Sequence, residues 1–190
     1  MMEIFFKDYL ENLSTALKKV DTKSIDILLD DVVKCAREKK TMFLCGNGGS
    51  AGNANHLAND FVYGVAKAHG CGLNAISLSA NASVITCLGN DLGYENIFSE
   101  QLAVHAKRGD ILIVLTGSGN SKNILKVLSE AKSLNVKTHA IVGYDGGQAK
   151  KISDNFIHIP IDDMQISEDF QLIVGHVIMQ KIYKSGALKK

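Results

Sequence analysis

Apolar residues recur at helical spacing along most of the chain, and short apolar runs interrupt this pattern at regular intervals. The spacing predicts helices over residues 3–19, 23–38, about 50–66, 81–89, 95–107, 121–134 and about 165–184. The apolar runs between them predict buried strands at 42–46, 73–79, 111–116, 137–143 and 155–160. Strands that alternate with helices and are apolar on both faces indicate a parallel sheet covered on both sides. We therefore expect an α/β three-layer sandwich with a central five-stranded parallel sheet and extra N-terminal helices.

Chain length and composition indicate one soluble domain. The 190 residues contain one proline and no Gly/Ser-rich linker, so we expect a single domain over residues 1–190. Apolar residues make up 46% of the chain and charged residues 22%, which is typical of soluble globular proteins. The net charge of +1 provides no general attraction to nucleic acid or to an anionic membrane, so neither is expected as a partner.

Cysteine usage and the missing targeting signals favour the cytoplasm. The chain starts with an amphipathic, acidic segment rather than a signal peptide, and no apolar run approaches the roughly 18–20 residues of a membrane helix. None of the cysteines forms a Cys-x-x-Cys pair. We interpret all four as reduced core thiols: Cys35, Cys45, Cys71 and Cys87.

A glycine-rich turn follows the most hydrophobic strand and carries three hydroxyls, those of Thr116, Ser118 and Ser121. Free amides, hydroxyls and a helix N-terminus at one junction favour a phosphate group. The alternative is an ordinary helix N-cap, for which serine is also preferred. The turn lacks the third glycine of the dinucleotide motif and the lysine of a P-loop. We therefore expect a monophosphate ligand and no nucleotide cofactor.

A second glycine-rich turn, 46–50, follows the first predicted strand and contains Asn47 and Ser50. Alone it is a weak signal, because such turns are common. In a parallel sheet, however, ligands bind at the carboxyl ends of the strands, where both turns fall. The two turns together suggest opposite walls of one binding cleft.

His56 and Asp60 are four residues apart on the helix that follows the first turn, so they share a helix face. Such a pair can bind a metal or transfer protons. The alternative is a solvated surface pair. The proximity of the pair to Ser50 favours a functional role.

The last predicted helix places Glu168 and His176 among apolar residues. Eight residues put their Cα atoms about 12 Å apart along the helix axis. They could share one metal only if their side chains lean toward each other. The alternative is a hydrogen-bonded core histidine and a first-turn carboxylate. We interpret the other histidines as structural: His69, His105, His139 and His158.

Four stretches of the chain resemble the phosphoheptose isomerase group of the SIS superfamily: CGNGGSAGNANHLAND at 45–60, TCLGNDLGYENIFSEQL at 86–102, GDILIVLTGSGNSKNILKVL at 109–128 and GYDGG at 143–147. The resemblance implies a flavodoxin-like SIS domain that isomerises sedoheptulose 7-phosphate to D-glycero-D-manno-heptose 7-phosphate. It further implies a precursor role in lipopolysaccharide or capsule synthesis, a homotetramer with active sites between subunits, and one zinc ion per site.

The resemblance also implies roles for individual residues. Phosphate binding maps onto Thr116, Ser118 and Ser121, sugar contacts map onto Asn47 and Ser50, and the metal-site histidines map onto His56 and His176. The chain departs from the family pattern at four pocket positions. Asp60 replaces a glutamate, Glu168 a glutamine, Asn81 an aspartate and Gln165 another acidic residue. His56, Asp60, Glu168 and His176 could still hold a divalent metal, while the departures leave a different ketose phosphate as an alternative substrate.

Aldose–ketose isomerisation requires a base, a group that moves protons between two oxygens, and positive charge near the developing oxyanion. Glu168 or Asp60 could be the base. His176 could be the partner acid or a zinc ligand, and these two roles exclude each other. A non-catalytic phosphosugar-binding regulatory protein is the competing hypothesis. The titratable residues at all four positions favour the enzyme.

Overall fold

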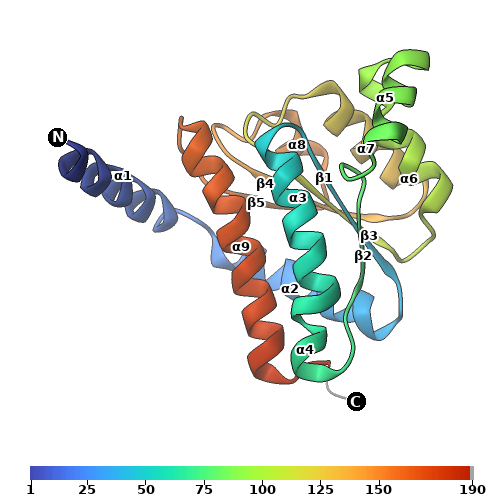
Figure 1. Cartoon of the computed structure of the whole chain (residues 1–190), viewed down its shortest axis with the longest axis horizontal. Coiled ribbons are helices and arrows are strands. Elements are labelled where there is room, and N and C mark those ends of the chain that lie inside the picture. Colours follow the sequence, from blue (N-terminus) through green and yellow to red (C-terminus); the bar gives the residue numbers. More distant parts are fainter. Residues whose placement is uncertain (189–190) are drawn as a thin grey trace.

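A five-stranded, all-parallel sheet forms the centre of the molecule in the computed structural model, which describes residues 1–188 and, for residues 68 and 69, the backbone alone. The strands are β1 (Thr41–Gly46), β2 (Asn74–Ser77), β3 (Ile111–Thr116), β4 (Lys137–Val142) and β5 (Asn155–His158). Their order in the sheet is β2-β1-β3-β4-β5, as in flavodoxin-like folds (Figure 1). The expected α/β sandwich is therefore confirmed.

Helices cover both faces of this sheet (Figure 1). They are α1 (Met2–Leu17), α2 (Thr22–Arg37), α3 (Gly49–Asn59), α4 (Ala66–His69), α5 (Ala82–Asp91), α6 (Ser99–His105), α7 (Lys122–Ser133), α8 (Gly147–Ile152) and α9 (Met164–Ser185). A π-helix, η1 (Asp60–Gly64), continues α3, and a 3-10 turn, η2 (Tyr94–Asn96), precedes α6. The short helix α8 and the π-helix were not predicted from the sequence.

The central strands are buried because alternate side chains enter two separate cores. On β1, Met42 and Leu44 join the core beneath α2, α3 and α9, whereas Phe43 and Cys45 join the core beneath α6 and α7. Every residue of β3 is buried. This two-sided burial explains the continuous apolar run in the sequence.

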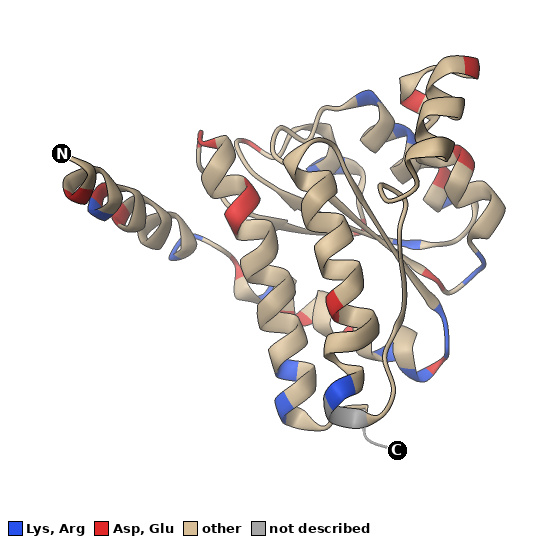
Figure 2. Cartoon of the chain, in the orientation of Figure 1, with Lys and Arg blue, Asp and Glu red and all other residues tan. Residues whose placement is uncertain are grey.

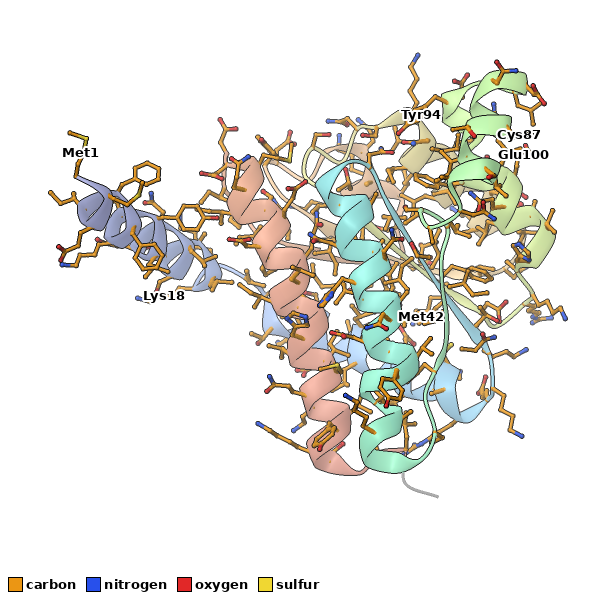
Figure 3. All side chains as sticks on the ribbon, viewed as in Figure 1. Met1, Lys18, Met42, Cys87, Tyr94 and Glu100 are labelled. Atoms are coloured by element: carbon orange, nitrogen blue, oxygen red, sulfur yellow. The ribbon has the colours of Figure 1, made fainter. Side chains whose placement is uncertain are left out.

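Two helices present side chains away from these cores. The N-terminal half of α1 extends from the body and exposes a set of large apolar residues: Met1, Met2, Ile4, Phe5, Phe6 and Leu10 (Figures 1 and 3). Helix α5 contains no buried residue. Its Cys87, labelled in Figure 3, is exposed. The expectation that this cysteine is a core thiol was therefore wrong. Of its apolar residues, Ile85 and Leu88 are partly buried against the core beneath α6 and α7.

The other cysteines fit the expectation more closely. Cys35 and Cys45 are buried and Cys71 is half-buried, and all four thiols are free. Burial, together with the nearby charges of Asp110 and Glu38, raises the pKa of Cys35 to about 12. This thiol therefore stays protonated at neutral pH.

Charges of both signs are spread over the helices and loops (Figure 2), in line with the small net charge. Within residues 1–188, no helix combines the length and the apolar character needed to cross a membrane.

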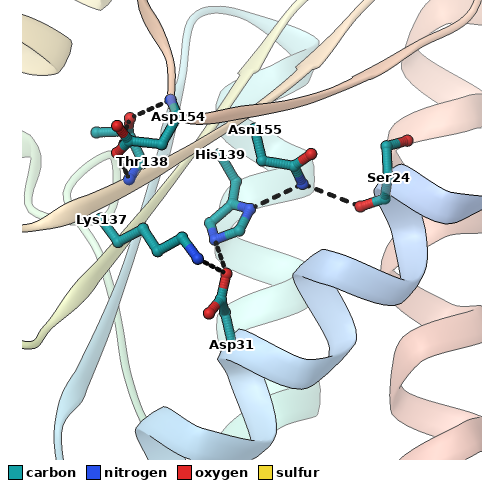
Figure 4. Close-up of polar contacts among 7 residues, drawn as sticks. All are labelled: Ser24, Asp31, Lys137, Thr138, His139, Asp154 and Asn155. Carbon is teal, nitrogen blue, oxygen red and sulfur yellow. Dashed lines mark hydrogen bonds and ion pairs between the residues drawn. The ribbon is translucent and has the colours of Figure 1, made fainter.

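A buried polar chain ties α2 to β4 and β5 (Figure 4). Asn155 Nδ2 donates to Nδ1 of His139 at 3.1 Å and to the Ser24 carbonyl at 2.9 Å. His139 Nε2 lies 3.2 Å from Asp31 Oδ2. Lys137 Nζ is 2.6 Å from the same oxygen. His139 is thus a fully buried, structural histidine, as expected.

Asp31 is predicted to stabilise the fold in a pH-dependent way. Burial raises the pKa of Asp31, but hydrogen bonding and charge from His139 and Lys137 lower it below the ordinary value. A depressed folded-state pKa stabilises the fold above the unfolded pKa of about 3.9, and this contribution is lost as the pH falls through the folded pKa. We expect Asp31→Asn to lower the free energy of unfolding at pH 7 by about 1–3 kcal/mol. The difference in free energy of unfolding between wild type and Asp31→Asn should shrink below pH ~4.

Urea unfolding of both proteins between pH 3 and 7 measures this effect. Asp30→Asn removes the same charge from the exposed neighbouring position and should leave stability nearly unchanged. An equal loss for both variants would contradict the assignment.

Candidate functional site

A cavity of about 280 Å³ lies where β1 and β3 end, between the two glycine-rich loops. It is formed by the loop after β1, the loop after β3 and the start of α9. Six residues singled out from the sequence line it: Asn47, Ser50, Thr116, Ser118, Ser121 and Glu168. The structure therefore brings both loops together at the carboxyl edge of the sheet, the usual ligand position in this class of fold.

The loop after β3 presents hydroxyl groups whose lone pairs are already used by its own backbone. Gly119 N donates to Thr116 Oγ1 at 3.2 Å, and Asn120 N donates to Ser118 Oγ at 3.3 Å. Each hydroxyl proton thus remains free to donate to a ligand. Ser121 is the N-cap of α7 and makes no side-chain cap bond. These groups meet at a helix N-terminus, which favours an anion.

A glycine is required at the tip of this loop. Gly119 has φ +68°, and a Cβ at this position would overlap the backbone of Gly146. Gly119 O also accepts from Ala149 N at 2.9 Å. The loop therefore rests on the start of α8.

A reciprocal amide pair joins the two loops. Asn47 Nδ2 donates to Asn123 Oδ1 at 2.9 Å, and Asn123 Nδ2 donates to Asn47 Oδ1 at 2.8 Å. Tyr94 Oη adds a bond to Asn47 Oδ1 at 3.1 Å. Asn47 was expected to contact the sugar, yet its amide already makes three hydrogen bonds, to Asn123 and Tyr94. Sequence reasoning missed Asn123, which carries no signal beyond its place in the first turn of α7.

Helices α3 and α9 pack side by side and run in the same direction (Figure 1). At the level of the cavity, Gln171 Nε2 donates to Ser50 Oγ at 2.9 Å and Gln171 Oε1 accepts from Asn53 Nδ2 at 3.0 Å. One turn lower the backbones approach closely, because a Cβ at Gly175 would overlap the side chain of Leu57. Gln171 and Asn53 were also missed from the sequence, because their roles depend on this pairing.

Next to this close approach, His56, Asp60 and His176 converge. The Nε2 atoms of the two imidazoles are 2.9 Å apart, and Asp60 Oδ2 lies 3.3 Å from each of them. One ligand atom from each residue lies within 4.8 Å of the others. His56 and His176 are 49% and 39% exposed, so a metal could reach them from solvent. Asp60 begins the π-helix η1, a feature that often marks functional sites.

The donor set suits zinc. Two neutral imidazole nitrogens and one carboxylate oxygen match the ligands of catalytic zinc sites, which keep a further position for water or substrate. The three side chains come from α3, its π-helical continuation η1 and α9, which contact one another. The residues present therefore fit a zinc ion.

Glu168, expected as a fourth ligand, lies apart from these three residues. Its Cα is about 12 Å from that of His176 along α9. The side chain lines the cavity instead, and its carboxylate packs against Gly49 at the start of α3. The structure thus brings together three of the four expected ligands.

Two expected substrate contacts lie outside the cavity in this chain. Asn81 is exposed and caps α5, where its Oδ1 accepts from Val84 N at 3.2 Å. Gln165 is exposed on the first turn of α9. Among the histidines interpreted as structural, His105 is exposed, His158 bonds to the Tyr144 carbonyl, and the side chain of His69 lies outside the described residues.

Comparison with known proteins gives consistent matches. Residues 5–143 match the family model of the SIS domain. The chain is 37% identical over 183 residues to a phosphoheptose isomerase of Helicobacter pylori (strain Shi470), covering 96% of this chain and 93% of the relative. It is 34% identical over 187 residues to a phosphoheptose isomerase of a Nitratiruptor species, covering 97% of this chain and 100% of the relative. The structure of a phosphoheptose isomerase from Neisseria gonorrhoeae matches with a TM-score of 0.86 at 25% identity, covering 96% of this chain and 97% of that one.

Proposed function

Because the chain belongs to the phosphoheptose isomerase group of the SIS-domain family, we propose that it interconverts sedoheptulose 7-phosphate and D-glycero-D-manno-heptose 7-phosphate through an enediol. The proposal rests on one observation: a cavity and a His/Asp/His group both lie along the helix pair α3 and α9. The cavity with the hydroxyl-rich loop lies at the start of α3 and α9, and the His/Asp/His group lies two turns along.

The two sites share a face of α3, whereas on α9 Glu168 and His176 lie about 80° apart around the helix axis. Gly49 and His56 are seven residues apart on α3, which returns the helix to within about 20°. A phosphate bound at the first site therefore leaves the rest of the molecule free to extend toward the imidazoles. The separation of about 12 Å along α9 suits a long open-chain sugar phosphate better than a short one.

We assign phosphate binding to the loop after β3. Thr116, Ser118 and Ser121 donate hydroxyl protons, and the N-terminus of α7 favours the negative charge. The hydrogen bonds to the phosphate supply binding energy that orients C1 and C2 at the other end of the sugar. Asn47 holds the two walls together through Asn123, and Ser50 is fixed by Gln171.

We assign proton transfer between C1 and C2 to Asp60. Its Oδ2 faces both imidazoles, and Oδ1 remains available to take a proton from carbon. Removal of that proton from C1 moves its C–H electron pair into the C1–C2 double bond of the enediol, while the carbonyl oxygen on C2 gains a proton. Asp60 then returns the carbon proton to C2, and the C1 hydroxyl loses its proton to become the aldehyde carbonyl. His56 and His176 would hold a zinc ion, which would supply positive charge beside the two sugar oxygens.

We further propose one zinc ion, held by His56, Asp60 and His176. Zinc would supply Lewis-acid polarisation of the two sugar oxygens. The four free thiols agree with work in the reducing cytoplasm.

A homotetramer is the assembly we propose. The exposed apolar face of α1 and the unburied helix α5 are surfaces that a second copy could cover. Light scattering after size-exclusion chromatography measures the mass, and the mass of a single chain would contradict this assembly.

The activity is tested by incubating the protein with zinc and sedoheptulose 7-phosphate and following the aldose product. We expect turnover, and Ser118→Ala should raise KM roughly 10- to 100-fold, because it removes a hydrogen bond to a charged group. Ser129→Ala removes an exposed hydroxyl from α7, the helix that follows this loop, and should behave as wild type. Wild-type protein that leaves the ketose unchanged would refute the proposed reaction.

The metal group is tested by titration of the metal-free protein with Zn²⁺. We expect one ion per chain, and His176→Ala should weaken binding roughly 100-fold or more because one of three ligands is lost. The same variant should lower kcat by roughly 10²- to 10⁴-fold. His105→Ala removes an exposed histidine elsewhere and serves as the control. Unchanged zinc affinity in His176→Ala would rule out this ligand set.

A further inference from the structure

Two helix N-termini open onto the cavity, and each could attract a phosphate group. Helix α3 begins at Gly49 after the loop 46–48, and α7 begins at Lys122 after the loop 117–121. The N-cap of neither helix makes a side-chain cap bond, so both ends present amide protons. On backbone geometry alone, a phosphosugar could bind in either of two opposite directions.

Glu168 makes the two ends different. It is the sole ionisable residue among those that line the cavity. Within residues 1–188, its carboxylate has no hydrogen-bond or ion-pair partner. The side chain packs on the first residue of α3, since a Cβ at Gly49 would overlap both carboxylate oxygens. A negative charge therefore already sits at the N-terminus of α3.

The backbone around Glu168 is held in place. Asn53 Nδ2 donates to the Glu168 carbonyl at 3.0 Å and also bonds to Gln171. The neighbouring acid points elsewhere, because Asp169 Oδ2 accepts from Tyr9 Oη at 2.6 Å. Of these two adjacent carboxylates, Glu168 faces the cavity and Asp169 faces α1.

We propose that Glu168 is a positioning residue that fixes the direction in which the phosphosugar binds. Its carboxylate repels a phosphate from the start of α3 and leaves the loop 117–121 as the phosphate site. The hydroxyl-bearing part of the sugar then lies beside Glu168, which can accept hydrogen bonds from it. The reacting end continues toward His56, Asp60 and His176. This inference rests on the proposed function and adds a rule of substrate selection to it.

The rule concerns the number of phosphate groups. A monophosphate places its one charge on the α7 side and meets Glu168 with neutral hydroxyls. A bisphosphate brings a second anion past the same carboxylate, in a cavity whose lining contains no cationic residue. The site should therefore discriminate against ketose bisphosphates.

Glu168→Gln tests the proposal because it removes the charge and keeps the size of the side chain. We expect inorganic phosphate, measured by calorimetry, to bind roughly tenfold more tightly. With sedoheptulose 7-phosphate, reversed and non-productive binding should lower kcat and KM together. The ratio kcat/KM should stay within about threefold of wild type or rise. Inhibition by sedoheptulose 1,7-bisphosphate should become roughly tenfold stronger.

The matched control is Asp169→Asn, which removes a carboxylate from the next residue but outside the cavity. It should leave phosphate affinity, kcat and KM near wild-type values. Two results would overturn the proposal. One is unchanged phosphate affinity in Glu168→Gln. The other is a fall in kcat/KM of more than about 100-fold, which would make Glu168 a proton-transfer group.

The phosphate titration does not depend on turnover. If the wild-type protein fails to isomerise the heptose phosphate, the proposed function fails, while the affinity shift in Glu168→Gln still decides the role of this carboxylate.

Discussion

The parallel packing of α3 against α9 is the contact on which the site depends. Gly175 lets the two helices approach, since any side chain there would overlap Leu57. Above this point Gln171 bridges Ser50 and Asn53, and below it His176 meets His56 and Asp60. Because the helices run in the same direction, one pair of elements carries both the wall of the cavity and the whole His/Asp/His group.

The sheet supplies the other half of the arrangement. Strands β1 and β3 are neighbours, so the two loops at their carboxyl ends face each other, and the Asn47–Asn123 amide pair fixes their spacing. Neutral hydroxyl and amide donors then offer an anion site without a cationic side chain. In such a cavity one carboxylate has a large effect, because the described residues that line it include no cation to offset the charge. Glu168 therefore matters more for where a phosphate binds than its exposure alone suggests.

Much of this molecule could be predicted from local patterns. Buried strands appear as short apolar runs, and the loops appear as glycines and hydroxyls at the strand ends, as at Thr116 and Ser118. The pair His56 and Asp60 follows from helix periodicity. Tertiary partners such as Gln171 and Asn123 could not be predicted, because their roles arise only when α9 and α7 are in place. The same reason explains Glu168: spacing allowed a metal ligand, but the packing of α9 directs its carboxylate to Gly49.

The most direct test of the account is a crystal structure of the protein soaked with sedoheptulose 7-phosphate and zinc, with anomalous data collected at the zinc edge. We predict phosphate density on Ser118 and Ser121 and an anomalous peak between His56, Asp60 and His176. Sugar density should run from one to the other past Glu168. Phosphate bound at the start of α3, or a zinc peak remote from the two imidazoles, would contradict it.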